Sequence, residues 1–290
     1  MPKPVEHFIK SLTQFSERIE EALGSTRSLY PSDPTAVNWY RGTGMSEQWK
    51  LAPSLYRHPT IKDVDELLKL ERKLLASFRR KAILYQPTNL SLTHTNTGAS
   101  ADYEFLFFMQ HYNVPTRLLD WTENPFIALY FALTSAPYNR ATHGYDEGAS
   151  VWILDPIAWN RKALERVTYG NEGALIFNGQ YSGAYAPRTN DTPQELTGMY
   201  DNPVAMEGIA NNTRMFAQKG VFTIFGRDMT PMEDHYEAKS YPKESLTKLT
   251  VAKDDIDSML ELISSIGYTD SVAYPDLHGL AMEIKRFHKF

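Results

Sequence analysis

The sequence predicts an α+β fold, on three observations: a globular composition, apolar residues that recur with both helical and strand periods, and no regular alternation of the two kinds of segment. Hydrophobic residues make up 42% and charged residues 22% of the 290 positions, as in chains that bury a core. Because β-α-β units do not follow one another, a purely parallel sheet is not expected. The length suits one large domain or two modest ones.

The first third of the chain is predicted to be mainly helical. Apolar residues at helical spacing over residues 5–23, followed by Gly24, predict an amphipathic helix. We therefore expect an N-terminal helical segment over residues 1–30, ahead of a single domain over residues 31–290. Further expected elements are a strand at 37–41, a helix at 63–85, a polar loop at 87–100 and an apolar helix at 101–112.

The rest of the chain mixes strands and helices. Residues 169–203 are rich in Gly, Asn, Tyr and Pro and predict a long loop insertion. The other expected elements are a strand at 116–122, a buried helix at 125–133, a strand at 150–155 that enters a helix at Pro156, a strand at 221–225, a helix at 253–265 and a terminal helix at 280–290.

Composition and motifs exclude several classes of site. The chain has no cysteine, which excludes disulfides and thiolate chemistry, and its eight histidines lack metal-ligand spacing, so no metal is expected. A net charge of −5 gives no general attraction to nucleic acid. No apolar run approaches the ~18 residues of a membrane span, and we expect a cytoplasmic protein without membrane contact. The P-loop and the G-x-S-x-G pattern are also absent.

The stretch HYNVPTRLLDWTENPFIALYFA, residues 111–132, places Arg117 and Asp120 inside a run that otherwise reads as core. Asn113 suits a left-handed position after a helix, and Asn124 with Pro125 is typical of a helix start. A buried charge without a partner costs several kcal/mol. Arg117 and Asp120 therefore either pair with each other in the core or face a cleft. In the second case they share it with His111, Tyr112 and Trp121.

Three other segments carry polar residues at the ends of apolar runs. In WYRGTG, Arg41 precedes two glycines that flank Thr43, where a guanidinium can hold phosphate oxygens and the glycines let a ligand approach. In RMFAQKGVFTIFG, Gln218 and Gly220 precede a strand. In YPDLHGLA, Asp276 and His278 lie in a turn, where an aspartate usually caps a helix. A basic face on the 63–85 helix is either solvated or contacts phosphate: Arg72, Lys73, Arg79, Arg80 and Lys81.

Taken together, YRG, HYNVPTRLLDWTENPFIALYFA, QKGVFTIFG and YPDLHGLA resemble the motifs of the FRG domain family, in the family's order, over residues 38–281. The order is also similar, more distantly, to that of ADP-ribosyltransferases. In that comparison Arg41 matches the first strand, and Thr122 matches the second with the helix residues Ala128, Phe131 and Ala132. Gln218 matches the third, but Gly220 stands where those enzymes carry a glutamate. Candidates for the missing carboxylate are Asp120, Glu207 and Asp276.

The resemblance implies a compact ADP-ribosyltransferase-like fold with a central, mainly antiparallel sheet flanked by helices. It implies NAD as the substrate, no metal, and a toxin of a bacterial toxin–antitoxin or phage-defence system. The target would be a macromolecule, RNA or another nucleic acid being favoured over protein, and an antitoxin protein would be a partner. Its catalytic residues would be Arg41, Asp120 and Gln218. The alternative is a non-catalytic FRG domain that binds a nucleotide or a partner. The NAD contacts implied are Tyr40, Arg41, Thr43, His111, Tyr112, Arg117, Trp121 and Thr122.

Overall fold

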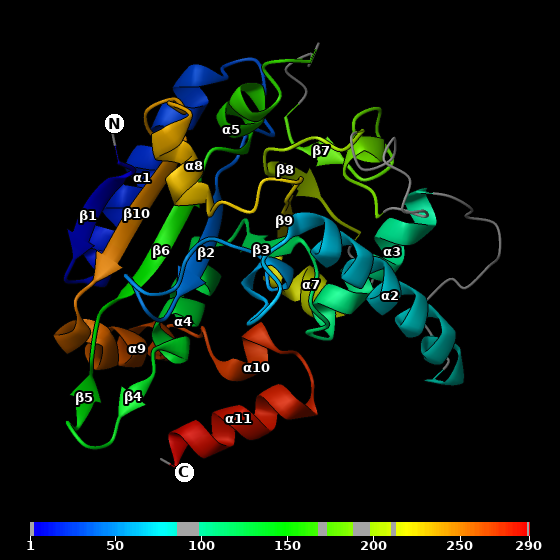
Figure 1. Cartoon of the computed structure of the whole chain (residues 1–290). Helices are drawn as coiled ribbons and strands as arrows, with labels where there is room; N and C mark the ends of the chain where they lie inside the picture. Colours follow the sequence, from blue (N-terminus) through cyan, green and yellow to red (C-terminus); the bar gives the residue numbers. More distant parts are fainter. Residues whose placement is uncertain (1–2, 86–98, 168–172, 188–197, 210–212, 289) are drawn as a thin grey trace.

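The protein folds around one large sheet, as a computed structural model shows (Figure 1). The structure describes residues 3–85, 99–167, 173–187, 198–209, 213–288 and 290. Its strands are β1 (Val5–Ile9), β2 (Trp39–Thr43), β3 (Leu118–Thr122), β4 (Tyr138–Asn139), β5 (Gly144–Tyr145), β6 (Ala149–Leu154), β7 (Leu175–Ile176), β8 (Val204–Glu207), β9 (Gly220–Ile224) and β10 (Leu246–Val251). Its helices are α1 (Leu12–Leu29), α2 (Val64–Ala82), α3 (Ala99–His111), α4 (Pro125–Ser135), α5 (Pro156–Ala163), α7 (Thr213–Gln218), α8 (Met232–Ala238), α9 (Ile256–Ser265), α10 (Asp270–Ala273) and α11 (Leu277–Phe287).

The main sheet has eight strands in the order β1-β10-β6-β2-β3-β9-β8-β7. All pairs from β10 to β8 are antiparallel, and only the two outermost pairs, β1 with β10 and β7 with β8, are parallel. Helices lie against the sheet along its length (Figure 1). The predicted fold class, α+β with a mainly antiparallel sheet flanked by helices, is therefore confirmed.

Two hydrophobic clusters hold the helices on the sheet. One cluster packs α1, α4 and α9 against β2, β6 and β10 through Phe15, Leu129 and Ile256, among others. The other packs α2, α3, α5 and α8 against β3, β8 and β9, with Phe107 and Trp159 completely buried. Successive residues of one strand enter different clusters, Trp39 the second and Tyr40 the first, as a pleated strand requires. The core therefore lies on both faces of the sheet.

The start of the chain differs from the prediction. Residues 5–9 form β1 and pair with β10, so they are not the first turns of a helix. The α1 helix begins after Ser11, whose side chain accepts a hydrogen bond from the Gln14 amide, and it continues through Gly24 to Leu29. Val5, Phe8 and Ile9 fit a helical period, but pairing with a strand more than 200 residues away decides their conformation. The N-terminal segment is thus part of the sheet.

Local signals elsewhere are confirmed. Asn113 has φ 58° directly after α3, and Asn124 accepts hydrogen bonds from the Phe126 and Ile127 amides with Pro125 at the first position of α4. Asp276 caps α11 through the Gly279 amide. The strand expected at 116–122 is shorter, and β8 and β10 were not predicted. The described part of the predicted loop at 169–203 contains β7 and a short 3-10 turn, while most of the predicted loop at 87–100 lies outside the described residues.

Over the part of the chain that the structure describes, no helix combines the length and apolar character that crossing a membrane requires. The same residues contain no group of three or more His, Asp or Glu side chains arranged to hold a metal ion.

Candidate functional site

Three adjacent strands carry the segments that stand out in the sequence. β2 neighbours β3, and β3 neighbours β9, so that Tyr40, Thr122 and Gly220 lie side by side across the sheet. A cavity of about 460 Å³ opens beside these strands and is also bordered by α3, α4, α7 and the residue after α10. All but two of the predicted site residues line it: Tyr40, Arg41, Thr43, His111, Asp120, Trp121, Thr122 and Gln218.

Arg41 is the most deeply placed cation of this cavity. Its side chain is 22% exposed, and one terminal nitrogen donates a hydrogen bond to the carbonyl of Asp120. The same nitrogen lies 4.0 Å from a carboxylate oxygen of Asp120, and the buried Nε has no hydrogen-bond partner among the described residues. Burial lowers the pKa of Arg41, with the nearby Arg57 acting in the same direction and Asp120 opposing it. A second anion in the cavity would therefore stabilise this guanidinium.

Asp120 is held by its neighbours but stays accessible. Its carboxylate accepts a hydrogen bond of 2.6 Å from the side-chain amide of Gln110, and Gln110 in turn accepts one from Thr116. The Asp120 side chain is 57% exposed, which fits a group that faces a ligand rather than the core. Asp120 is the one carboxylate that lines the cavity within the described part of the chain. A bound ligand would thus meet one fixed negative charge.

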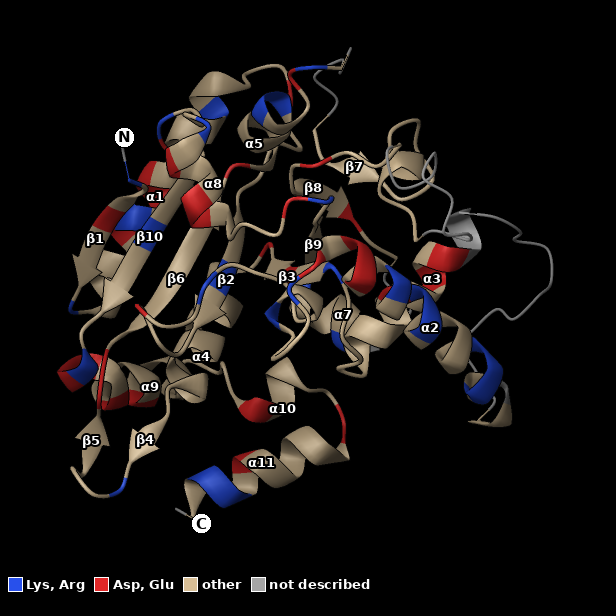
Figure 2. Ribbon diagram, in the orientation of Figure 1, with Lys and Arg blue, Asp and Glu red and all other residues tan. Residues whose placement is uncertain are grey.

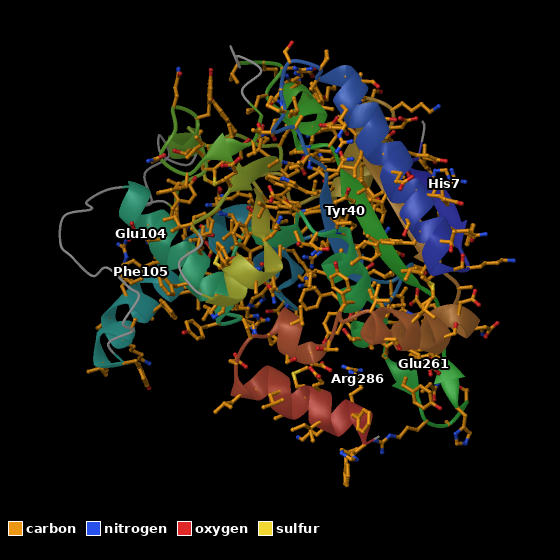
Figure 3. All side chains as sticks on the ribbon, turned by 180° about the vertical axis from the view of Figure 1, so that it is seen from behind. His7, Tyr40, Glu104, Phe105, Glu261 and Arg286 are labelled. Carbon is orange, nitrogen blue, oxygen red and sulfur yellow. The ribbon has the colours of Figure 1, made fainter. Side chains whose placement is uncertain are left out.

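The remaining predicted residues mostly form the wall of the cavity, and their polar groups bind other groups of the protein. The indole of Trp121 is 3% exposed and donates to the Thr223 hydroxyl, Thr122 donates to the Gln218 carbonyl, and the Gln218 side chain donates to the Ala273 carbonyl at 2.8 Å. Tyr40 lies in the middle of the protein and packs in the cluster under α4 (Figure 3). These contacts join β3, α7 and α10 around the cavity.

Arg117 does not lie in the cavity, which corrects the expectation that it shares a cleft with Arg41. Its side chain is completely buried, and it pairs with Glu71 of α2 and not with Asp120. The two other guanidinium nitrogens donate to the carbonyls of Phe225 and Tyr185. Arg117 lies in the bend before β3, whereas Asp120 lies within that strand and is exposed. Arg117 therefore links α2 to the segments that adjoin β3 and β9.

Tyr112 is the second predicted residue that the structure places elsewhere. It follows the last residue of α3, is 59% exposed and does not line the cavity, although His111 and Asn113 on either side of it do. The left-handed conformation of Asn113 turns the chain at this point.

The glycines of WYRGTG have a structural role. A Cβ atom on Gly42 would lie 2.0 Å from the carbonyl oxygen of Ala128, and one on Gly44 would lie 2.3 Å from the carbonyl carbon of Ser135. Both contacts are with α4, which therefore packs directly on the backbone of β2. The glycines therefore allow a helix to approach this strand closely.

Three further cations line the cavity and were not selected from the sequence: Lys50, Arg57 and Arg214. With Arg41 they give four permanent positive charges against the one carboxylate of Asp120. The Arg214 guanidinium lies 4.1 Å from the ring centroid of Tyr274, which borders the cavity from the turn after α10. Burial and Arg214 lower the pKa of His111. Arg214 and Tyr274 belong to motifs noted in the sequence, whereas Lys50 and Arg57 carry no recognisable signal there.

Glu207 and Asp276, the other candidates for a catalytic carboxylate, do not line the cavity. The Asp276 side chain caps α11. Glu207 ends β8, and its pKa is raised by burial and by the negative charge of Glu123.

Comparison with known families bears directly on this cavity. Residues 36–140, which include β2, α3, β3 and α4, match the family model described as the FRG domain. The chain contains an FRG domain. The FRG domain family predicted from the sequence motifs is therefore confirmed. The family model matches residues 36–140, a shorter range than the residues 38–281 over which the motifs occur.

Two curated proteins also show a weak similarity. Both are cytidylate kinases, from Streptococcus pyogenes serotype M5 (strain Manfredo) and serotype M18 (strain MGAS8232), and each is 26% identical to the chain over 152 residues. The alignment covers 47% of this chain, which spans 65% of the length of each kinase. The phosphate-binding P-loop pattern is absent from the sequence. No solved structure matches the chain significantly.

The FRG domain supplies only part of the cavity. Arg41, Lys50, Arg57 and Asp120 lie within residues 36–140, whereas Arg214, Gln218 and Tyr274 are contributed by later segments. Cations are spread over the elements around β2, β3 and α7 (Figure 2). The complete cavity thus depends on strand pairing between the FRG domain and β9.

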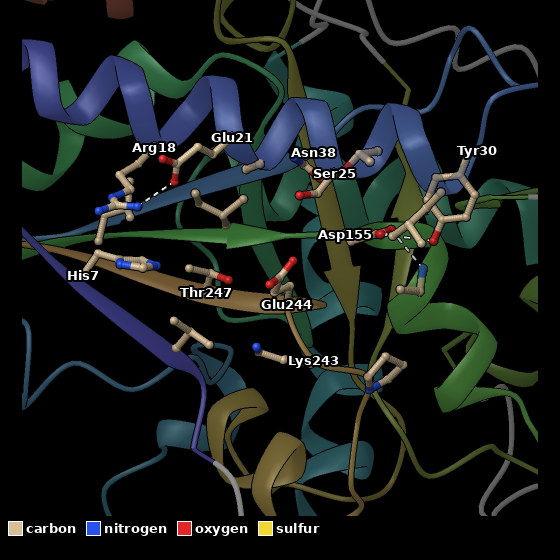
Figure 4. Close-up of a pocket in the computed structure, with 18 of the residues that line it drawn as sticks. His7, Arg18, Glu21, Ser25, Tyr30, Asn38, Asp155, Lys243, Glu244 and Thr247 are labelled. Carbon is tan, nitrogen blue, oxygen red and sulfur yellow. Dashed lines mark hydrogen bonds and ion pairs between the residues drawn. The ribbon is translucent and has the colours of Figure 1, made fainter.

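A second cavity, of about 570 Å³, lies between α1 and the sheet (Figure 4). Its charged groups balance: Arg18 pairs with Glu21, Arg161 lies over the Tyr30 ring, and the Tyr30 hydroxyl donates to Asp155. Lys243 and Glu244 border the same space. This balance indicates no particular ligand, unlike the positive excess beside β2 and β3.

Proposed function

We propose that the cavity beside β2, β3 and β9 binds NAD and that the chain is an ADP-ribosyltransferase. One observation carries this proposal: the three segments that resemble transferase motifs, far apart in sequence, lie on neighbouring strands around one cavity. Their order across the sheet places the Arg41 strand next to the Thr122 strand, and that next to the strand that begins at Gly220.

The charges of the cavity suit a dinucleotide. The pyrophosphate of NAD carries two negative charges, and Arg41, Arg57 and Arg214 can donate charge-assisted hydrogen bonds to its oxygens. Trp49 and Tyr274 offer aromatic faces at the border of the cavity for a base or for nicotinamide. The free side of the Asp120 carboxylate can accept a hydrogen bond from a ribose hydroxyl.

The reaction needs no metal. The bond between nicotinamide and C1′ of the ribose breaks, and its electron pair leaves with nicotinamide. The ribose then resembles an oxocarbenium ion, which a target nucleophile attacks at C1′ while its proton passes to solvent water. Asp120 would stabilise the positive charge that develops on the ribose, because preorganised charges act strongly in a partly closed site. Arg41 would hold the pyrophosphate and fix the position of C1′.

A second function is supported by a specific observation. The third strand begins at Gly220, where related transferases carry a glutamate, and Asp120 is already engaged by Gln110 and Arg41. A non-catalytic FRG domain that binds a nucleotide through the same cations accounts for this arrangement. NAD or ADP-ribose would then bind without release of nicotinamide.

The biological setting that we propose is a toxin of a bacterial toxin–antitoxin or phage-defence system. A transferase in such a system would modify RNA, another nucleic acid or a protein, and an antitoxin protein would restrain it. This part of the proposal rests on the resemblance to FRG domain proteins. Growth arrest on controlled expression of the chain, relieved by substitution of Arg41, would support it.

Calorimetry with NAD and an assay for nicotinamide release separate the two functions. The Arg41→Ala variant should bind NAD about 10- to 150-fold more weakly, since hydrogen bonds to charged groups contribute ~1.5–3 kcal/mol. Arg227→Ala is a matched control, because Arg227 is similarly exposed at 25% and pairs with Asp65 outside the cavity. Binding without nicotinamide release would favour the non-catalytic function. Absence of binding by the wild-type chain at millimolar NAD would contradict both.

A further inference from the structure

The C-terminal helix α11 exposes four large apolar side chains and contacts the rest of the protein through Glu283 and Arg286. Leu277, Leu280, Ile284 and Phe287 are 83%, 45%, 52% and 81% exposed. Because an α-helix turns about 100° per residue, the four form one stripe along the helix. Surface helices normally bury such a stripe.

The opposite side of α11 contacts the protein through polar groups. Arg286 donates two hydrogen bonds to the buried carboxylate of Asp270 in α10, and it faces α10 in Figure 3. Glu283 accepts a hydrogen bond from the Ser271 amide. Gly279 lets the helix approach the Tyr274 carbonyl, where a Cβ would lie 2.0 Å away. These contacts fix the orientation of α11, so the outward position of the apolar stripe is a property of the fold.

The stripe is symmetric along the helix. Leu277 and Phe287 lie five residues on either side of Met282, and Leu280 and Ile284 lie two residues on either side of it. The exposures repeat this symmetry, since the outer two side chains are the most exposed. A second copy of the helix, placed antiparallel across a two-fold axis that crosses the stripe at the level of Met282, would set Leu277 against Phe287 and Leu280 against Ile284. Such self-complementarity is what an isologous interface requires.

The charges along α11 fit the same arrangement. Asp276 caps the N-terminal end, while Lys285 and His288 lie at the C-terminal end. Antiparallel pairing brings Asp276 of one copy to His288 of the other, six residues on either side of Met282. It also places each helix N-terminus beside the partner's C-terminus, which is favourable for the two helix dipoles. A parallel arrangement would put like charges side by side.

We propose that the exposed face of α11 is a homodimer interface, in which two copies of the helix pack antiparallel about Met282. The inference does not depend on the proposed enzymatic function. One helix pair buries less surface than the ~1,200 Å² of a standard interface, so the dimer should dissociate on dilution. Sedimentation velocity on the full chain from about 1 to 200 µM should show a shift from monomer to dimer.

Substitutions on the exposed face test the surface. Leu280→Glu/Ile284→Glu should remain monomeric at every concentration, with an unchanged melting temperature at low concentration, because both side chains are exposed within one subunit. Leu84→Glu is the control, since Leu84 is 81% exposed in the 3-10 turn directly after α2, a helix that lies away from α11 (Figure 1). A wild-type chain that stays monomeric throughout, or dimers that survive the double substitution, would overturn the proposal.

Cysteine cross-linking tests the geometry, because the chain has no cysteine of its own. In the antiparallel pair Leu280 of one copy lies at the same level as Ile284 of the other, whereas the two copies of Leu277 are offset by about 15 Å along the axis. A disulfide needs Cα atoms within about 7 Å. Leu280→Cys mixed with Ile284→Cys should therefore form a disulfide-linked dimer on mild oxidation, as should Leu277→Cys mixed with Phe287→Cys, whereas Leu277→Cys alone should not. Efficient self-linking of Leu277→Cys would show parallel helices and contradict the proposal.

Discussion

Arg117 and Glu71 form an ion pair inside the protein, with the Arg117 Nε atom 2.9 Å from a Glu71 carboxylate oxygen and both side chains at most 1% exposed. The pair joins β3 to α2, and the two other guanidinium nitrogens bind the carbonyls of Phe225 and Tyr185. Each of the three guanidinium nitrogens of Arg117 therefore has a partner within the protein, whereas the partly buried Arg41 faces the cavity.

Replacing Arg117 by leucine should lower the free energy of unfolding by ~3–5 kcal/mol, because Glu71 is left as a buried charge without its partner. Glu71→Gln should also lower the free energy of unfolding, but by a smaller amount. Arg117→Leu/Glu71→Leu should recover part of the loss, since neither charge remains, although the Phe225 and Tyr185 carbonyls lose their donor. Urea denaturation of the three variants checks this. Equal stability of Arg117→Leu and the wild-type chain would show that the pair is not structural.

Gly42→Ala should destabilise the protein by more than ~3 kcal/mol, because the added methyl group collides with the backbone of α4 and not with a flexible side chain. Gly24→Ala is a matched control: Gly24 lies within α1, and nothing surrounds the position of its Cβ. There alanine should raise stability by about 0.5–1 kcal/mol. Thermal denaturation of both variants should show opposite shifts. Tolerance of alanine at position 42 would argue against direct packing of α4 on β2.

Asp120→Asn should leave stability almost unchanged, within ~1 kcal/mol, because the side chain is more than half exposed and its interactions are screened by solvent. If the cavity is catalytic, the same change should reduce nicotinamide release by orders of magnitude while NAD still binds. Asp65→Asn is the control, since Asp65 pairs with Arg227 outside the cavity. Full activity of Asp120→Asn would remove Asp120 from the mechanism.

His235 should make the protein sensitive to acid. The side chain is completely buried, and burial lowers its pKa to about 4, against the attraction of Asp228. The folded protein therefore favours the neutral form of His235. Above the pKa of about 6.5 that the side chain has in the unfolded chain, its contribution to the free energy of unfolding is constant. That contribution is lost as the pH falls from about 6.5 to 4, in total ~3 kcal/mol.

The difference between wild type and His235→Leu isolates this effect from other groups, such as Asp155 and Glu233, whose pKa values are raised by burial. Unfolding free energies measured from pH 8 to 4 should fall more steeply for the wild-type chain below pH 6.5. Parallel curves for the two proteins would mean that His235 titrates normally.

Local chemistry allowed much of the segment 111–132 to be predicted. The left-handed Asn113, the cap at Asn124 and the start of α4 at Pro125 depend on residues within a few positions of one another. The FRG motifs and the grouping of Arg41, Asp120 and Gln218 were also predicted from sequence, but Arg41 and Asp120 lie in the middle of β2 and β3 and meet because these two strands are neighbours.

Long-range contacts decided the rest. Nothing near Arg117 identifies Glu71, 46 residues earlier, as its partner, and Val5–Ile9 becomes a strand only because β10 lies beside it. In the sequence Gly42 reads as a glycine for ligand access, and only the structure shows that α4 packs against its backbone. The outward face of α11 likewise depends on the pair between Arg286 and Asp270. In each case the contact that decides the local conformation is made with a group distant in sequence, so only the tertiary structure reveals it.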